Sequence, residues 1–253
     1  MSDAETFLQN AITAFNAGNF QLSVQALKQV FDAEPSFQQP EAAQYVASFP
    51  VQEKRNFWTA PAQLFENPGN IQKTFGTIYS QSIWGGGSGA GSDLRNTVMY
   101  VAYVQHFMER NSVKSVVDIG CGDWRFSQYL NFDGRQYLGV DVVESVIATN
   151  ASAHGRANVE FKTADATEFI IPQCDLLLCK DVLQHLSNSN VSAILKRCNV
   201  ATRALITNDY YPSNYDCKNG DTRPLYITAD PFNIVAVPRL AFQGKVTFLM
   251  AGP

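Results

Sequence analysis

Apolar residues in the first part of the chain recur at the spacing of one helix face. Between residues 3 and 33 they follow one another at steps of three to five positions, which predicts α-helix. Gly18-Asn19 interrupts this pattern, and Pro35 ends it. The pattern therefore predicts a helical hairpin, which needs another surface to pack on.

The segments that follow have weaker patterns. Residues 36–70 contain several prolines and predict short helices and loops. Residues 71–92 end in a run rich in glycine, which is too mobile for a core. A helix is then predicted to begin at Ser92 or Asp93, both helix-capping residues, and to extend to about residue 110.

From residue 113 short apolar strands alternate with helical segments. The strands are SVVDIG, YLGVDV, VEFKTAD, DLLLCKD and ALITNDY, and helices are predicted at 142–153 and 188–201. This alternation predicts an α/β fold with a parallel sheet covered on both faces. Two strand-like runs around Gln243-Gly244 predict a terminal β-hairpin.

These patterns divide the chain into three parts. Residues 1–70 are predicted as a helical N-terminal extension, and residues 71–112 as a lid segment with the helix that leads into the core. Residues 113–253 are predicted as the ligand-binding domain.

Composition excludes several classes of protein. Hydrophobic residues make up 45% of the 253 positions and charged residues 17%, so the chain is not intrinsically disordered. A net charge of −4 leaves no basic footprint for nucleic acid. The chain shows no secretory signal at its start and no apolar run of membrane-spanning length, so no membrane partner is expected. Five cysteines without a C-x-x-C pair favour reduced thiols and a cytoplasmic location.

A G-x-G turn follows the first strand of the domain. The apolar strand that contains Asp118 runs into Gly120-Cys121-Gly122. Glycine lets the backbone approach a ligand closely, and ligands of a parallel sheet bind beyond the carboxyl ends of its strands. A dinucleotide site would need glycine or alanine where this chain has Arg125, which disfavours a nicotinamide enzyme.

Two acidic residues end the next two strands. Asp141 comes about 20 positions after Gly120, where a carboxylate can bind both hydroxyls of a ribose. Asp165 could accept a hydrogen bond from an adenine amino group. The pattern therefore suits an adenosine better than a diphosphate, although each carboxylate could instead cap a turn or a helix.

Together these motifs resemble the class I S-adenosylmethionine-dependent methyltransferases over residues 113–250. The resemblance implies a Rossmann-like, doubly wound, mostly parallel seven-stranded sheet. It also implies S-adenosyl-L-methionine as the cofactor and S-adenosyl-L-homocysteine as the product. The acids that the family uses map onto Asp118, Asp141 and Asp165. The predicted cofactor site further includes Gly120, Cys121, Gly122, Trp124, Val142, Ala166 and Lys180.

The segment after the fourth strand, D-V-L-Q-H-L, resembles the substrate-facing segment of many small-molecule methyltransferases. His185 lies one helical turn after Asp181, and a neutral imidazole could take a proton from the acceptor during methyl transfer. The alternative is that His185 packs under the helix and forms only local hydrogen bonds.

The lid segment is predicted to cover the cofactor. Tyr79 and Trp84 would present aromatic faces to a sulfonium. The N–H groups of the glycine run, together with Arg95, would bind the cofactor carboxylate. The alternative is a disordered glycine loop.

The loop after the fifth strand is predicted to bind the acceptor, because loops at this edge of a sheet determine specificity. Its sequence resembles that of bacterial methyltransferases of uncertain substrate. Tyr210, Tyr211 and Arg223 are the predicted substrate-binding residues, and Asp209 joins Asp181 and His185 as a catalytic candidate. Arg223 would anchor a carboxylate or phosphate, or instead form an ion pair with a nearby aspartate.

A metal site is the alternative for the same edge of the sheet. Asp181, Asn208 and Asp209 resemble the oxygen ligands that catechol-type O-methyltransferases use for Mg²⁺. The surrounding motifs of that family are absent, and its order of acid and amide is reversed. No metal is therefore predicted.

The sequence predicts a methyltransferase that acts on an oxygen or nitrogen atom of a small molecule, without choosing between the two. The second hypothesis is a cofactor-binding scaffold that has lost its chemistry. It would recruit a partner, or self-associate, through the N-terminal hairpin, whose Gly18, Phe20, Ala26 and Pro35 resemble a single tetratricopeptide repeat.

Overall fold

The helical hairpin predicted at the N-terminus is present in the computed structural model, which describes residues 2–48 and 70–252. Helix α1 (Asp3–Asn16) and helix α2 (Phe20–Ala33) are joined by a short turn. Gly18 supplies this turn with a φ of +76°, a backbone conformation that favours glycine. Most of the irregular region predicted at 36–70 lies outside the described residues.

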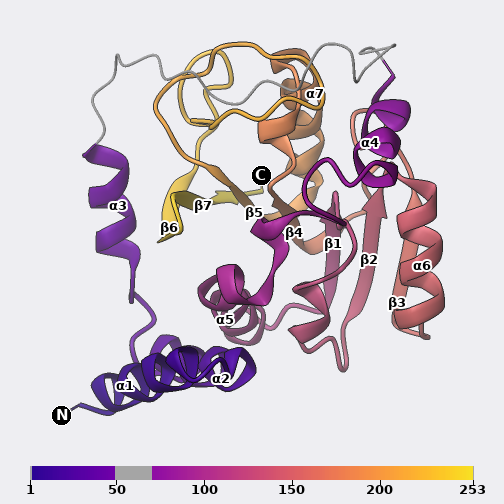
Figure 1. The fold of residues 1–253 in the computed structure, drawn as a ribbon. Helices are drawn as coiled ribbons and strands as arrows, with labels where there is room; N and C mark the ends of the chain where they lie inside the picture. Colours follow the sequence, from indigo (N-terminus) through magenta and orange to yellow (C-terminus); the bar gives the residue numbers. More distant parts are fainter. Residues whose placement is uncertain (1, 49–69, 253) are drawn as a thin grey trace.

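The hairpin packs on the rest of its own chain. Phe31 of α2 is fully buried, and its ring contacts Tyr103 of α5 (Leu94–Arg110) edge to face at 5.4 Å. The Asp32 carboxylate lies 2.7 Å from Nδ1 of His106 on α5. Figure 1 shows the hairpin, in indigo, below α5. The hairpin thus has a packing surface within the chain, and its likeness to a tetratricopeptide repeat stays a prediction.

Two further helices lie on either side of the stretch that is not described. Helix α3 (Gln39–Ala47) packs against the last part of the sheet, where Arg239 donates a hydrogen bond to Gln39 at 2.6 Å. Helix α4 (Ile71–Ser80) begins the predicted lid segment. None of the described helices has the length and apolar character that a membrane span requires.

The described strands form one seven-stranded sheet. They are β1 (Ser115–Ile119), β2 (Gln136–Asp141), β3 (Val159–Thr163), β4 (Cys174–Lys180), β5 (Ala201–Asp209), β6 (Val237–Phe242) and β7 (Lys245–Ala251). Their order is β3-β2-β1-β4-β5-β7-β6, and β7 runs in the opposite direction to the other strands of this sheet. Gln243 and Gly244 form the predicted hairpin turn, both with positive φ. The predicted fold class is confirmed.

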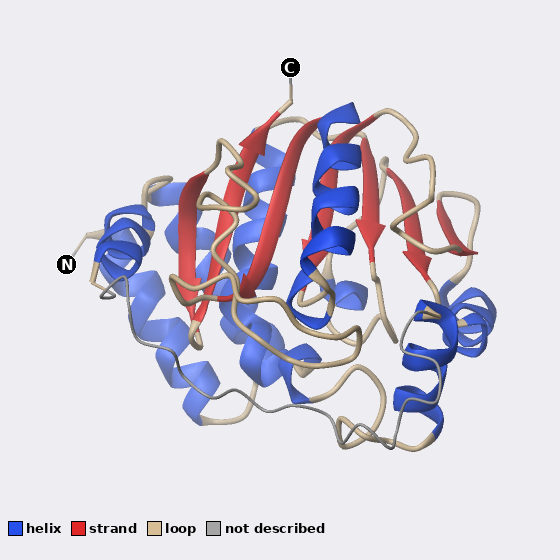
Figure 2. Cartoon of the chain, turned by 90° about the horizontal axis from the view of Figure 1, so that it is seen from above, coloured by secondary structure: helices blue, strands red, loops and turns tan. Residues whose placement is uncertain are grey.

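Alternate strand residues build apolar cores on both faces of the sheet. Leu176 and Leu178 of β4 belong to the core that includes α5. Leu177 and Cys179 belong to the core that includes α7 (Asn188–Arg197). Figure 2 shows helices on both sides of the strands. Helix α6 (Glu144–His154) connects β2 and β3, and short 3₁₀ turns occur at η2 (Ala90–Ser92), η3 (Ser127–Tyr129), η4 (Leu183–His185) and η5 (Cys198–Val200).

The carboxyl ends of the parallel strands meet at one edge of the sheet. In Figure 1 the strands β1 and β2 point toward α4 and toward the loops that gather beside it. Residues that follow the strands are thereby brought together although they lie far apart in the sequence. This is the edge at which open α/β sheets bind their ligands.

Candidate active site

A cavity of about 340 Å³ lies at the carboxyl edge of the sheet. Its volume falls within the range of about 300–1,000 Å³ that is typical of small-molecule sites. The lining includes most of the residues predicted from the sequence: Tyr79, Trp84, Gly120, Cys121, Gly122, Asp141, Val142, Asp165, Ala166, Lys180, Asp181, His185 and Asp209. The fold therefore brings the predicted cofactor and catalytic residues around one space.

The G-x-G turn and Asp141 form one wall of the cavity. Gly120 and Gly122 have φ values of +68° and +55°, which favour glycine. Asp141 accepts hydrogen bonds from the backbone N–H groups of Gly122 and Val143, both at 3.0 Å. Burial raises the pKa of Asp141, although these N–H groups oppose the shift. The carboxylate is thus held in place by the backbone and keeps lone pairs for further donors.

Asp118 and Trp124 lie behind this turn and do not line the cavity. Asp118 accepts a hydrogen bond from the Tyr137 hydroxyl at 2.8 Å, and burial raises its pKa to about 7. Trp124 is buried against the rings of Phe132 and Tyr137. Both residues support the turn from within the core, which differs from the direct cofactor contact expected of them.

Asp165 lines the cavity and also forms a local turn. Its Oδ1 accepts hydrogen bonds from the backbone N–H of Thr167 at 2.8 Å and from the Thr167 hydroxyl at 2.7 Å. This is an Asx-type turn. Both interpretations of Asp165, local cap and ligand contact, are therefore compatible with its position.

The glycine run is fastened to the G-x-G turn by Ser88 and Asp123. The Ser88 N–H donates to the Asp123 carboxylate at 3.1 Å, and the Asp123 N–H donates to the Ser88 hydroxyl at 2.9 Å. The Tyr79 hydroxyl lies 2.7 Å from the same Ser88 oxygen. A Cβ on Gly122 would collide with this oxygen. The lid segment therefore fits closely over the turn.

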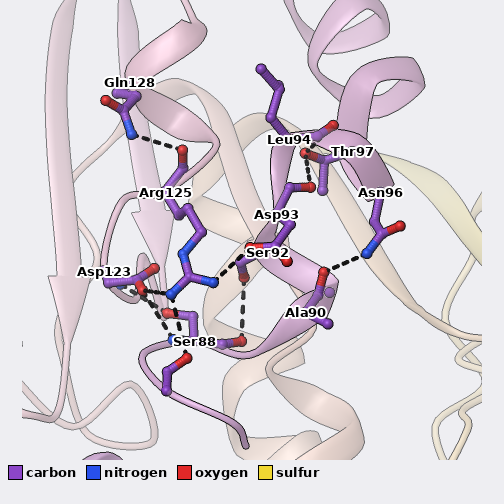
Figure 3. Close-up of polar contacts among 12 residues, drawn as sticks. Ser88, Ala90, Ser92, Asp93, Leu94, Asn96, Thr97, Asp123, Arg125 and Gln128 are labelled. Atoms are coloured by element: carbon purple, nitrogen blue, oxygen red, sulfur yellow. Dashed lines mark hydrogen bonds and ion pairs between the residues drawn. The ribbon is translucent and has the colours of Figure 1, made fainter. Parts of the chain in front are cut away.

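Arg125 strengthens this attachment from outside the cavity (Figure 3). Its guanidinium donates to Asp93 at 2.7 Å, to Asp123 at 3.0 Å and to the Gly86 carbonyl at 3.3 Å. Asp93 begins α5, but its side chain makes no capping hydrogen bond. We call Arg125 and its three partners the Arg125 clamp.

Arg95 does not reach the cavity. Helix α5 turns its side chain toward α2, where the guanidinium lies 5.4 Å from the centre of the Phe20 ring. This position does not favour the predicted contact with the cofactor carboxylate, because the helical period directs Arg95 away from the sheet edge.

His185 faces the cavity beside Trp84. The two ring centres are 4.6 Å apart. His185 Nδ1 lies 3.0 Å from the Asp221 carbonyl. A carbonyl only accepts hydrogen bonds, so Nδ1 carries the proton and Nε2 presents a lone pair. Burial lowers the pKa of His185 from its ordinary value of 6.5. The imidazole is therefore neutral at pH 7.

The sequence predicts that Asp181 and His185 lie one turn apart on the same α-helix, and the structure shows that they do not. His185 ends the 3₁₀ turn η4, and Asp181 has a φ of +57°. Such a φ is strained for a residue with a side chain. The N–H of Asp181 donates to the Thr207 carbonyl at 2.8 Å. The two side chains converge through this bend instead of through a helical turn.

Two lysines neutralise Asp181 and Asp209, two of the carboxylates that line the cavity. Lys180 lies 2.5 Å from Asp181, while Lys245 lies 2.9 Å from Asp181 and 2.5 Å from Asp209. Lys180 also donates to the Gly91 carbonyl at 3.0 Å. Burial would raise the pKa of Asp181, but the two lysines outweigh it and hold the pKa below its usual value. We call these four residues the lysine–aspartate network.

Lys245 was missed in the sequence analysis. It directly follows the Gln243-Gly244 turn, and its strand pairs antiparallel with β5 so that Lys245 lies opposite Asp209. The sequence does contain a signal for Lys245, because the residue after a hairpin turn at this edge of the sheet lies close to the ends of the parallel strands. Lys245 lies between the two acids that the magnesium alternative assigned as ligands. Within residues 2–48 and 70–252, no group of three or more acidic, histidine or cysteine side chains could hold a metal.

The predicted acceptor residues Tyr210, Tyr211 and Arg223 do not line the cavity. Arg223 is fully buried and donates to the carbonyls of Leu186 at 2.8 Å and Tyr215 at 2.5 Å. It therefore holds the loop after β5, and neither of its predicted roles is seen. The cavity is instead completed by residues that were not predicted: Ile71, Phe75, Gln184, Leu186, Ile194, Thr222 and Lys245.

Comparison with known proteins agrees with this geometry. Residues 116–204 match a family model described as a methyltransferase domain. Residues 116–204 are thereby identified as a methyltransferase domain. The match runs from β1 into β5 and thus contains the G-x-G turn, Asp141 and Asp165. The N-terminal helices and the terminal hairpin lie outside it.

Three known proteins are similar to parts of this chain. Phosphoethanolamine N-methyltransferase of Triticum aestivum is 34% identical over 89 residues, which are 33% of this chain and 18% of that protein. Human N-acetylserotonin methyltransferase, crystallised with SAM, has a TM-score of 0.50 at 12% identity and covers 90% of this chain and 70% of its own. Magnesium protoporphyrin IX methyltransferase of Synechocystis has a TM-score of 0.50 at 15% identity, with 73% and 98% covered.

These structural likenesses show the fold of the methyltransferase domain. The present chain spans less than a fifth of the wheat relative. The human and the Synechocystis structures were both determined with SAM bound. The roles of individual residues stay predictions.

Proposed function

We propose that this protein transfers the methyl group of S-adenosylmethionine to an oxygen or nitrogen atom of a small molecule. The observation that carries this proposal is the position of His185. A neutral imidazole, with its Nδ1 proton bound to the Asp221 carbonyl, lines the same cavity as the G-x-G turn and Asp141. In this proposal the proton acceptor and the adenosyl site share one cavity.

The described residues fit an adenosyl cofactor. A Cβ on Gly120 would collide with Val182, and one on Gly122 with Ser88, so only glycine lets the turn pack this closely beside the cavity. Asp141 would bind the ribose hydroxyls and Asp165 the adenine. Trp84 lines the cavity with a buried indole N–H that has no partner in the described part of the chain. This donor is available to a ligand.

His185 would act by removing the proton of the acceptor. When bound, S-adenosylmethionine supplies an electrophilic methyl group. The acceptor hydroxyl or ammonium loses a proton to Nε2 of His185, which becomes charged while Nδ1 stays bonded to the Asp221 carbonyl. The lid segment, fastened over the cavity by Ser88 and Asp123, would exclude water. A cytoplasmic location belongs to the same proposal and is supported by the five unpaired cysteines.

The alternative is a scaffold that binds the cofactor without turnover and recruits a partner through the N-terminal hairpin. Ile12 and Leu22 of this hairpin are 46% and 50% exposed, which favours a contact surface there. The burial of Phe31 against α5 shows that the other face of the hairpin is already used. Cofactor binding without methyl transfer to any acceptor would support the scaffold.

The first experiment is calorimetry with S-adenosylmethionine. We expect saturable binding to the wild-type protein and a loss of about 1–3 kcal/mol for Asp141→Ala, because the ribose would lose a charged acceptor. A second titration with NADH should give no binding. Unchanged affinity of Asp141→Ala, or saturable binding of NADH, would contradict the assignment of the site.

The second experiment measures transfer of a labelled methyl group to a panel of acceptors. The panel contains phenols, amines and phosphoethanolamine, because the wheat relative is named for the last of these. Phenol labelling would indicate O-methylation, and amine labelling N-methylation. No labelling with any acceptor, despite tight cofactor binding, would favour the scaffold.

A further inference from the structure

Lys245 enters the cavity from a part of the chain that the family match does not include. It is the first residue of β7. Because β7 runs antiparallel to β5, its first residue lies at the edge where the parallel strands end. The side chain is only 10% exposed, yet it lines the cavity. A buried lysine needs partners that compensate for its lost hydration.

Those partners are two carboxylates from two different strands. The Lys245 ammonium lies 2.9 Å from Asp181, which follows β4, and 2.5 Å from Asp209, which ends β5. Lys180 lies 2.5 Å from the other oxygen of Asp181. Burial would lower the pKa of Lys245, but the two carboxylates outweigh it and raise the pKa. The network therefore contains two cations and two anions and is balanced in charge.

This balance matters for His185. Of the charged groups that line the same cavity, Asp181, Asp209 and Lys245 act on its ring, and Lys180 is bonded to Asp181. The ring also contacts neutral groups, namely the Asp221 carbonyl, the Thr222 hydroxyl at 3.1 Å and the Trp84 ring. Without Lys245 the two carboxylates would attract a proton to the imidazole. A charged imidazole cannot accept a proton from the acceptor.

We propose that Lys245 is a positioning residue of this site, which bridges and neutralises Asp181 and Asp209 and so adds to the burial that keeps the His185 imidazole uncharged. Lys245 acts through the carboxylates and needs no contact with the acceptor. The inference rests on the proposed function only where it uses His185 as the proton acceptor. The charge balance itself is a property of the free protein.

The test is a histidine titration of the full chain by nuclear magnetic resonance, without cofactor or acceptor. The chain has three histidines, and the resonance that disappears in His185→Ala identifies the one of interest. We expect Lys245→Met to move the titration of His185 to higher pH, because two carboxylates lose a neutralising charge. Lys245→Arg keeps the charge and should restore the wild-type midpoint.

A second variant should shift the His185 titration in the opposite direction. It keeps the test valid if Lys245→Met folds poorly. Asp209→Asn removes one carboxylate, so His185 should titrate at lower pH than in the wild type. Lys114→Met is the matched control, because Lys114 is exposed and precedes β1 at the opposite edge of the sheet. Its His185 titration should equal that of the wild type.

The inference is overturned if Lys245→Met and Asp209→Asn both leave the His185 midpoint unchanged, or if both move it in the same direction. If Lys245 were only structural, Lys245→Met would lower the stability of the protein, but the two variants would not move the His185 titration in opposite directions. Full methyl transfer by His185→Ala would contradict the proposed function instead. That result would leave the titrations, and thus the neutralising role of Lys245, unaffected.

Discussion

The two ends of the cavity are built in different ways. At the proposed cofactor end, which holds the G-x-G turn, backbone groups and small residues shape the site, and the Asp141 carboxylate is fixed by N–H groups of Gly122 and Val143. At the proposed acceptor end, which holds His185, charged side chains neutralise one another in the lysine–aspartate network. The first end depends on local chain geometry. The second depends on strands that meet only in the folded protein.

This difference explains what the sequence could reveal. The G-x-G turn and Asp141 are separated by about twenty residues and form a recognisable pattern. Lys245 is separated by 64 residues from Asp181 and by 36 from Asp209. No short motif can record such contacts, because they follow from the antiparallel register of β7 with β5. If the ends are separable, variants at one end should affect mainly one property.

The largest effect is expected at the acceptor end. His185→Ala should lower the rate of methyl transfer by about 10²–10⁴-fold, because the acceptor would lose its general base. Cofactor affinity, measured by calorimetry, should change little. EDTA should not affect the wild-type rate, since the carboxylates of this end are occupied by lysines. A metal-dependent rate together with an active His185→Ala would reverse this assignment.

The pH profile tests the same residue in the wild-type protein. Burial lowers the pKa of His185 below 6.5, so the neutral, active form persists below that pH. The rate should therefore fall only when the pH drops below 6.5, as the ring takes up a proton. This acid limb should be absent from the residual activity of His185→Ala. A wild-type rate that already declines between pH 8 and 7 would contradict a lowered pKa.

The next effect is expected at the cofactor end. Gly120→Ala should weaken cofactor binding or stability by about 1–3 kcal/mol, because the new Cβ meets Val182 at a positive φ. Gly134→Ala is the matched control: Gly134 has the same φ of +68°, and no atom lies within 4 Å of the added Cβ. Calorimetry and thermal unfolding measure both variants.

The difference between these two variants isolates the contact with Val182. The double variant Gly120→Ala/Val182→Ala should recover part of the loss, since the colliding methyl groups are removed. If Gly120→Ala and Gly134→Ala prove equal, backbone strain alone accounts for the effect. The close approach at Gly120 would then have no energetic consequence, and the contrast between the two ends would be weaker.

The fold was more predictable than the direction of individual side chains. The strand patterns and the Gln243-Gly244 turn predict the sheet correctly, because apolar alternation and turn chemistry depend on residues that are close in the sequence. Arg95 and Arg223 were predicted to bind ligands, but α5 turns Arg95 toward Phe20, and Arg223 holds backbone carbonyls. A pattern identifies a charged residue near a site, but only the packing of its element decides where the charge points.

The smallest effect on stability is expected at the Arg125 clamp, which fastens the glycine run beside the cavity. Arg125→Gln should change stability by less than about 1 kcal/mol, because Arg125 and Asp93 are 35% and 47% exposed and water screens their attraction. High salt should reduce even this difference.

The effect of Arg125→Gln on the glycine run should be larger than its effect on stability. Hydrogen exchange of residues 85–93 should accelerate, and S-adenosylhomocysteine should dissociate faster. Arg110→Gln, at the opposite end of α5, serves as the control. If exchange and dissociation match the wild type, the reciprocal Ser88–Asp123 hydrogen bonds alone hold the loop, and the clamp contributes nothing to closing the cavity.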